Sequence, residues 1–368
     1  MKLSVQQPEL SKALSLVGNA VASRSTLPVL GNVLLEAQAD TLRISATNLE
    51  IGVQLFVAAK VEESGAITLP YRLLAEFVSS LQPQAVSIDL DERTQTAKLK
   101  CVKTTASIKG IDAAEFPAPQ RIDSNKAIAL PSQVLRRMID GVVGAAATDE
   151  SRPTLTGVET RLSEGRLHMA ATDGYRLSVM TQDVEADDEI TTIIPAASLR
   201  MIAKFLTGES DVMVALDENR VHVTAQDGNA EITSSIIGAK FPDYRAIIPK
   251  SKDVTVTVKR DKLQQAVKTA ALFARDNSNI VRVMAVTDAL TVAATSSEMG
   301  DSVNTIDAVC NLAEVFSFEA AFNARYLLDM LSATDADELT IEFTQPNRPL
   351  KCTVGDWMHV IMPMHTPR

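Results

Sequence analysis

The sequence contains an internal repeat of about 125 residues, which limits the possible fold more than any single motif does. "ATNLEIGV" begins at Ala46, "ATDGYRLSV" at Ala171 and "ATSSEMGDS" at Ala294, so the starts lie 125 and 123 residues apart. Three further pairs keep the offset of 125: Pro28 with Pro153, Pro70 with Pro195, and Phe116 with Phe241. Because several matches recur in one order, we expect three diverged domains, near residues 1–120, 121–250 and 251–368.

Each repeat has the same predicted succession of strands and helices. An alternating run such as "KLSVQ" or "VTVTV" precedes a segment with apolar residues at helical spacing, and further short alternating runs follow. A second helix begins near Pro70, Pro195 or Asn323, residue types that suit a helix start. The predicted helices span 8–24, 70–81, 131–147, 195–206, 259–275 and 323–333. The expected fold class is α+β, with two helices and antiparallel sheets in each repeated domain.

Composition and cysteine usage indicate a globular protein of a reducing compartment. Apolar residues make up 46% and charged residues 22% of the chain, and no window approaches the roughly 18 to 20 apolar residues of a membrane helix. The first residues lack the apolar segment of a secretory signal, so we expect a cytoplasmic protein without a membrane partner. The widely spaced Cys101, Cys310 and Cys352 predict reduced thiols that pack as small apolar side chains.

The sequence carries none of the common catalytic or cofactor-binding motifs, such as GxxxxGK[ST], GxGxxG, GxSxG or HExxH. Its four histidines are scattered, and the acidic run at 185–189 is more typical of a solvated connection than of a metal site. Trp357, the single tryptophan, is expected to cover the core rather than to anchor a partner. We expect no enzyme, no metal and no cofactor; the enzymatic alternative would use Asp173 and Arg176 of "ATDGYRLSV" as catalytic groups.

Positive charge is concentrated in the predicted helices. They contain thirteen Lys or Arg residues and five Asp or Glu residues, a net charge of +8, against −18 for the rest of a chain whose total is −10. Helix propensity alone does not explain this, because Glu favours helices as much as Lys and Arg do. If the helices share one face, that face attracts a polyanion although the whole protein is acidic.

Several motifs, in order along the whole chain, resemble those of a known family. They are "TLPVLGNV", "ATNLE", "EFP", "RPTLTGV", "ATDGYRL", "FPDY" and the terminal "VIMPM". With the three repeats and the basic helices, they make the chain similar to the bacterial DNA polymerase III β subunits, the DNA sliding clamps. The resemblance implies a head-to-tail homodimer in which six domains form a ring, with sheets outside and helices lining the hole.

For DNA, the resemblance implies sequence-independent binding of an encircled duplex by exposed basic side chains of the helices. The expected DNA-binding residues are Arg24, Arg72, Arg136, Arg137, Arg200 and Lys204, and Lys12, Lys268 and Arg275 are weaker candidates. Such a clamp is a processivity factor that holds the replicative polymerase on DNA. Its implied partners are the polymerase α subunit, the clamp loader and other proteins with a clamp-binding motif.

For partner proteins, the resemblance implies a hydrophobic peptide-binding groove between the "ATDGYRL" turn and the C-terminal segment. The matching residues are Leu155, Thr172, Gly174, Tyr175, Arg176, Leu177, Pro242, Ile247, Val360, Met362, Pro363 and Met364. Two departures from the family pattern concern this groove. Ala246 stands at a rim position where an arginine is common, and residues 365–368 extend beyond the usual end.

For the dimer, the resemblance implies that an edge strand of the first domain pairs with one of the third domain. The matching interface residues are Ala106, Ile108, Leu272 and Phe273, and Ala106 is smaller than the aromatic residue sometimes found there. The sequence also allows a monomeric peptide-binding adaptor that does not bind DNA. Gel filtration separates the two, since the chain of 39.6 kDa doubles its mass as a dimer.

Overall fold

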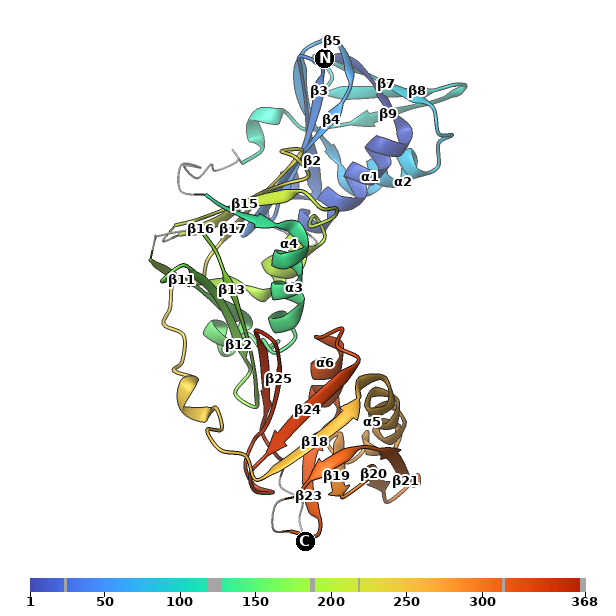
Figure 1. The fold of residues 1–368 in the computed structure, drawn as a ribbon. Helices are drawn as coiled ribbons and strands as arrows, with labels where there is room; N and C mark the ends of the chain where they lie inside the picture. The colour runs from blue at the N-terminus through green and yellow to red at the C-terminus, as the bar shows by residue number, and fades with distance from the viewer. Residues whose placement is uncertain (23–24, 118–126, 186–188, 218, 313–314, 365–368) are drawn as a thin grey trace. The chain divides into compact units, whose positions relative to one another are not determined.

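The computed structural model of the chain describes all residues except 23–24, 118–126, 186–188, 218, 313–314 and 365–368 (Figure 1). Its described residues divide into two compact units. The first comprises Met1–Arg136 and Ala197–Ile236, and the second comprises Arg137–Ala196 and Ile237–Arg368. The middle repeat therefore contributes to both units.

The first unit contains a five-stranded and an eight-stranded antiparallel sheet, counted over the described residues. The smaller sheet has the order β5-β1-β7-β8-β9, with β1 (Lys2–Gln6), β5 (Lys60–Glu63), β7 (Ala85–Asp91), β8 (Thr96–Cys101) and β9 (Thr104–Lys109). The larger sheet has the order β10-β15-β16-β17-β4-β3-β2-β6, with β2 (Asn32–Gln38), β3 (Thr41–Thr47), β4 (Ile51–Ala58), β6 (Gly65–Pro70), β10 (Ile128–Pro131), β15 (Asp211–Leu216), β16 (Arg220–Ala225) and β17 (Ala230–Ser235). Pairing of β4 with β17 joins the first repeat to the second.

The second unit has the same plan. Its nine-stranded sheet, again counted over the described residues, has the order β14-β11-β12-β13-β26-β25-β24-β18-β22. These strands are β11 (Gly157–Ser163), β12 (Arg166–Thr172), β13 (Arg176–Asp183), β14 (Ile190–Pro195), β18 (Val254–Lys259), β22 (Val309–Asn311), β24 (Glu338–Phe343), β25 (Leu350–Val354) and β26 (Trp357–Ile361). The second sheet has the order β21-β20-β19-β23, with β19 (Ile280–Val286), β20 (Ala289–Ser296), β21 (Gly300–Asp307) and β23 (Phe318–Asn323). Pairing of β13 with β26 joins the second repeat to the third.

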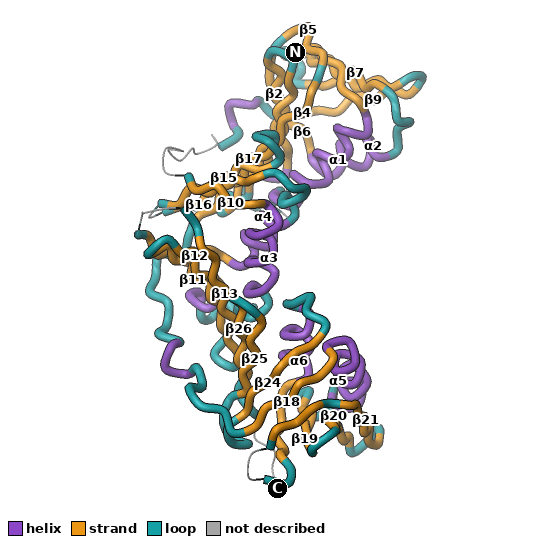
Figure 2. The backbone as a smooth tube through the Cα atoms, in the orientation of Figure 1, coloured by secondary structure: helices purple, strands orange, loops and turns teal. Residues whose placement is uncertain are grey.

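Two helices follow strands in each repeat, as the sequence predicts (Figure 2). They are α1 (Gln7–Val17), α2 (Tyr71–Ser79), α3 (Ser132–Val143), α4 (Ala196–Ala203), α5 (Arg260–Ala274) and α6 (Ala324–Ser332). Helix α1 ends earlier than its apolar pattern predicts, because a 3₁₀ turn over Gly18–Ala20 leads to extended backbone at Val21. Among the described helices, none has the length and apolarity that crossing a lipid bilayer requires.

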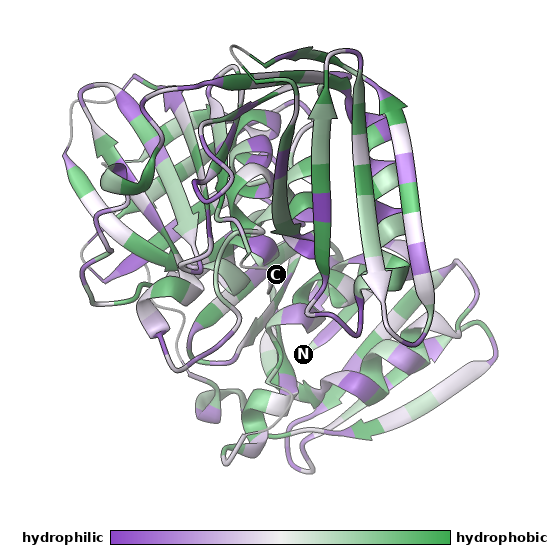
Figure 3. Ribbon diagram, turned by 90° about the horizontal axis from the view of Figure 1, so that it is seen from below, coloured by the Kyte–Doolittle hydropathy of each residue, from purple (hydrophilic) through white to green (hydrophobic). Residues whose placement is uncertain are grey.

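Alternating side chains place the core on one face of each strand. Strand β7 alternates exposed residues with buried Val86, Ile88 and Leu90, the pattern that "AVSIDLD" predicts. Figure 3 shows the same change between apolar and polar residues along many strands. The α+β fold class, with three repeats and antiparallel sheets, is therefore confirmed.

Trp357 packs in the core beneath the junction of β13 and β26. Its side chain is buried, and its indole Nε1 donates to Gly141 O at 2.8 Å and to Ser178 Oγ at 2.9 Å. A Cβ atom at Gly141 would lie 3.2 Å from Trp357 Cδ1, so glycine permits the close approach of α3. The core interpretation of Trp357 is confirmed.

His359, two residues further along β26, is buried beside the tryptophan, with ring centroids 5.6 Å apart. Within the described residues, neither ring nitrogen has a hydrogen-bond partner. Burial lowers the pKa of His359 to about 3, and the Arg176 guanidinium adds to this shift. The imidazole is therefore neutral in the folded protein at neutral pH.

This pKa predicts a specific loss of stability in mild acid. In the unfolded chain His359 takes up a proton below its ordinary pKa of 6.5, whereas in the folded protein it does so only near 3. Its contribution to the free energy of unfolding is complete above pH 6.5 and declines as the pH falls, by about 2 kcal/mol at pH 5. Thermal unfolding of the wild type and of His359→Leu between pH 7.5 and 5 measures this loss of stability. The melting temperature of the variant should fall less than that of the wild type, and an equal fall in both proteins would contradict the low pKa of His359.

Candidate functional site

The turn between β12 and β13 is fixed by hydrogen bonds from its own short polar side chains. Thr172 Oγ1 donates to Arg176 O at 2.6 Å and accepts from the Gly174 N–H at 3.1 Å. Asp173 Oδ1 accepts from the N–H groups of Tyr175 and Arg176 at 2.9 and 3.0 Å. Gly174 has a φ of +92°, a conformation that glycine adopts without steric cost. The motif "ATDGYR" therefore specifies one rigid turn.

Arg176 attaches this turn to α6. Its Nε donates to Asp173 Oδ2 at 3.1 Å, its Nη1 donates to Asp329, and its guanidinium carbon lies 4.5 Å from the centroid of the Tyr326 ring. Only 10% of the Arg176 side chain is exposed. Burial raises the pKa of Tyr326, with nearby Asp173 adding to the effect. Asp173 and Arg176 thus hold the turn and the helix together.

The C-terminal segment runs alongside the turn. In the β13–β26 pair Leu177 lies opposite Val360, and the Met362 N–H donates to Tyr175 O at 2.8 Å. The Met364 N–H donates to Ala321 O at 2.7 Å. The backbone of the "VIMPM" segment is therefore fixed against both the turn and β23, although these parts are far apart in sequence.

An apolar cluster lies beneath this junction. Its buried members are Ala170, Leu177, Ile193, Phe241, Tyr244 and Val360, with Val179, Ile237, Ile248 and Met358 packed against them in partly buried positions. Phe241 and Tyr244 come from "FPDY", and their rings meet edge to face at 6.2 Å. The sequence prediction included Leu177 and Val360 but not Phe241, Tyr244 or Val179, although the repeated "FP" pair was a signal for Phe241.

The remaining predicted groove residues differ in their exposure. Tyr175 is 54% exposed at the turn, Pro242 and Ile247 are exposed, and Met362, Pro363 and Met364 are half-buried. Leu155 is buried in a 3₁₀ turn, where its carbonyl accepts from the Ala147 N–H at 2.8 Å. Ala246 is exposed beside Ile247, and residues 365–368 lie outside the described part of the chain.

The predicted DNA-binding residues are exposed wherever the structure describes them. Arg72 lies on α2, Arg136 and Arg137 lie on α3, and Arg200 lies on α4. Lys204 follows α4, and its Nζ donates to Asn19 Oδ1 at 2.5 Å. Arg24 falls outside the described residues.

The predicted dimer residues belong to two elements. Ala106 and Ile108 lie on β9, an end strand of its sheet, and Leu272 and Phe273 lie in the last turn of α5. Ile108 is only 3% exposed, whereas Leu272 is 52% exposed. The helix therefore offers more apolar surface to a partner than Ile108 does.

Comparisons with known proteins give one consistent result. Models of the N-terminal, central and C-terminal domains of the DNA polymerase III beta subunit match residues 1–120, 129–243 and 245–365. The beta sliding clamp of Synechocystis is 32% identical over 376 residues, with 95% of each chain covered. The crystal structure of the Bacillus subtilis DNA polymerase sliding clamp covers both chains fully, with a TM-score of 0.93 at 26% identity. That of the Pseudomonas aeruginosa DNA polymerase III subunit beta gives 0.91 at 27%.

The contacts of Arg176 predict a stability change that depends on its planar, forked guanidinium. Arg176→Lys keeps the charge but loses the paired contacts with Asp173 and Asp329, so it should destabilise the second unit by about 1–3 kcal/mol. The matched control is Arg166→Lys, because the Arg166–Asp183 pair is 57% and 79% exposed and should contribute less than about 1 kcal/mol. Urea unfolding measures the free energy of unfolding of both variants. An equal loss of stability in the two would contradict this role for Arg176.

Proposed function

The chain belongs to the family of DNA polymerase III beta subunits, the beta sliding clamps, and we propose that it acts as a ring-shaped homodimer around duplex DNA. It is a non-catalytic processivity factor for DNA polymerase III. The observation that carries this function is the match of three domain models in order along the whole chain. We propose 1–120, 121–250 and 251–368 as its domains and the cytoplasm as its location.

Two strand edges that have no partner among the described residues support the proposed dimer. In the first and second repeats, the third strand after the first helix (β4 or β13) pairs with the last strand of the following repeat (β17 or β26). In the third repeat the strand that corresponds to β4 and β13 is β21, and in the first repeat the strand that corresponds to β17 and β26 is β9. Each of these two strands is an end strand of its own sheet. Exposed edges tend to pair with another chain. Pairing of β21 in one copy with β9 in a second copy completes the same pattern, with Leu272 and Phe273 of α5 beside it.

Exposed basic residues on the helices support the DNA role. We propose that Arg24, Arg72, Arg136, Arg137, Arg200 and Lys204 face the duplex. With two helices per domain and about 10 Å for each, a six-domain ring has a lining of about 120 Å and an opening of roughly 28 Å. A DNA duplex fits through such an opening with water between its phosphates and the protein. The cations then attract DNA without reading its sequence, and encirclement rather than affinity retains the protein.

The apolar cluster beneath the turn supports the partner site. We propose that short peptides of the polymerase α subunit, the clamp loader and other partners bind over Leu177 and Val360. We propose that Tyr175, Pro242, Ile247, Met362 and Met364 also line this site. Methionine side chains adapt readily to different apolar partners, which suits a surface shared by several proteins.

Retention on DNA tests encirclement. Loaded with a clamp loader onto a nicked circular plasmid, the protein should stay bound through gel filtration, and linearising the plasmid should release it. The double variant Leu272→Glu and Phe273→Glu should elute as a monomer of 39.6 kDa and should not be retained. Retention on linear DNA would contradict encirclement, and a dimeric double variant would contradict the proposed interface.

A point variant tests the peptide site. Tyr175→Ala removes an exposed ring while leaving the turn's backbone bonds in place, so affinity for a polymerase α-subunit peptide should fall at least tenfold. Met299→Ala is the matched control, because Met299 is also an exposed apolar residue, at 50%, on the turn between β20 and β21. Fluorescence polarisation with a labelled peptide measures both affinities. An unchanged affinity for Tyr175→Ala would refute the assignment of this residue.

A further inference from the structure

The first unit contains a second copy of the turn described above, 125 residues earlier in the chain. Thr47 Oγ1 donates to Ile51 O at 2.9 Å and accepts from the Leu49 N–H at 3.0 Å. Asn48 Oδ1 accepts from the N–H groups of Glu50 and Ile51 at 3.0 and 2.8 Å. These bonds correspond one for one to those made by Thr172 and Asp173. The turn before β4 therefore has the geometry of the turn before β13.

The neighbouring strand is also equivalent. The Ser235 N–H donates to Glu50 O at 2.8 Å, as the Met362 N–H does to Tyr175 O at the same distance. Phe116 and Pro117 stand 125 residues before Phe241 and Pro242. The first unit thus reproduces the framework of the proposed peptide site.

The side chains on this framework differ in size and polarity. Gly52 takes the place of Leu177, so the side chain at the centre of the apolar cluster is missing. Ser45 and Gln54 take the places of Ala170 and Val179. Opposite them on β17, Thr233 pairs with Gly52 and Glu231 with Gln54, where Val360 and Met358 pair with Leu177 and Val179. At this position the first unit therefore has polar side chains where the second unit has an apolar cluster.

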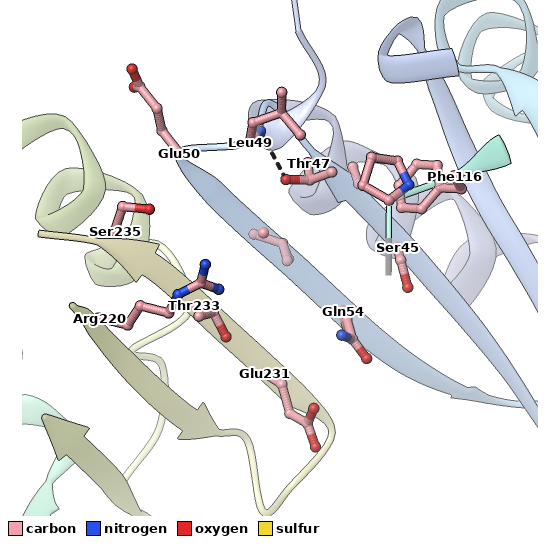
Figure 4. A pocket seen from close by; sticks show the side chains of 14 residues that line it. Ser45, Thr47, Leu49, Glu50, Gln54, Phe116, Arg220, Glu231, Thr233 and Ser235 are labelled. Atoms are coloured by element: carbon pink, nitrogen blue, oxygen red, sulfur yellow. Dashed lines mark hydrogen bonds between the residues drawn. The ribbon is translucent and has the colours of Figure 1, made fainter. Parts of the chain in front are cut away.

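A pocket of about 100 Å³ lies at this position. Figure 4 shows Gln54 and Glu231 on neighbouring strands, with Arg220, Thr233 and Phe116 around the same space and the bond from Leu49 to Thr47 dashed. Ser45 is 2% and Gln54 is 9% exposed, yet Ser45 Oγ and Gln54 Oε1 have no hydrogen-bond partner among the described residues. A buried polar atom without a partner is costly, so these two atoms point to a ligand that supplies hydrogen bonds.

We propose that this pocket is a second peptide-binding site, which takes a partner side chain carrying a primary amide. The inference rests on the proposed function, because it extends peptide binding from the second repeat to the first. An amide both donates and accepts, so its NH₂ group suits Gln54 Oε1 and Glu231 while its oxygen suits Ser45 and Arg220. Exposed Leu49 and half-buried Pro117 provide apolar contact for a neighbouring residue of the peptide.

The test uses the full-length protein and a capped dipeptide, N-acetyl-Phe-Gln N-methylamide, whose only primary amide is that of the glutamine side chain, with saturation-transfer NMR titration as the measurement. N-acetyl-Phe-Leu N-methylamide, which has no primary amide, should bind the pocket at least tenfold more weakly. Gly52→Leu restores the missing side chain, and the nearest atom to a Cβ there would be Thr47 Oγ1 at 3.8 Å, so the backbone accommodates a side chain at this position. It should weaken binding of the glutamine probe at least tenfold.

Gln54→Leu is a second variant that should prevent binding of the glutamine probe, and its melting temperature shows whether it still folds. It should also weaken binding tenfold, but it should raise the melting temperature of the free protein because it removes a buried oxygen without a partner. Tyr175→Ala should leave binding of the glutamine probe unchanged. Loss of binding in Tyr175→Ala with retention in Gly52→Leu, or no binding to the wild type, would overturn the second site. Failure of the polymerase peptide to bind the wild type would instead refute the proposed function.

Discussion

The structure depends on antiparallel pairing between strands of successive repeats. A sheet that stops at a repeat boundary leaves a row of backbone N–H and C=O groups without partners, and these groups must find partners wherever they are buried. The β4–β17 and β13–β26 pairs satisfy them by making one sheet from strands of two repeats. The same pairing sets the register that brings Leu177 opposite Val360 and so creates the apolar cluster of the proposed partner site.

The sequence predicts features that arise from local pattern. The repeat, the six helical segments and the strand alternation all follow from periodicity, and the described structure has them with shorter helix ends. Burial of Trp357 also follows from composition and position, since a single tryptophan within an alternating strand usually packs inward. These features require no knowledge of which strands meet.

Features that depend on long-range pairing are beyond sequence reasoning without the family resemblance. Nothing near Arg176 in sequence indicates that its guanidinium lies over Tyr326, 150 residues away, because that contact requires α6 to pack beside the β12–β13 turn. The pocket over Gly52 was likewise missed. Its signal was present, since an offset of 125 places Gly52 against Leu177, but a missing side chain becomes a cavity only when the opposing strand also lacks a large one.

The three equivalent junctions differ in how their strength depends on protein concentration. The β4–β17 and β13–β26 pairs each lie within one chain, so their formation is unimolecular and independent of how much protein is present. In the proposed ring the β9–β21 pair lies between chains, and its occupancy follows mass action. Cellular abundance then sets the fraction of closed rings through this junction alone, and separation of the two edge strands opens the assembly without disturbing the folded core of either protomer.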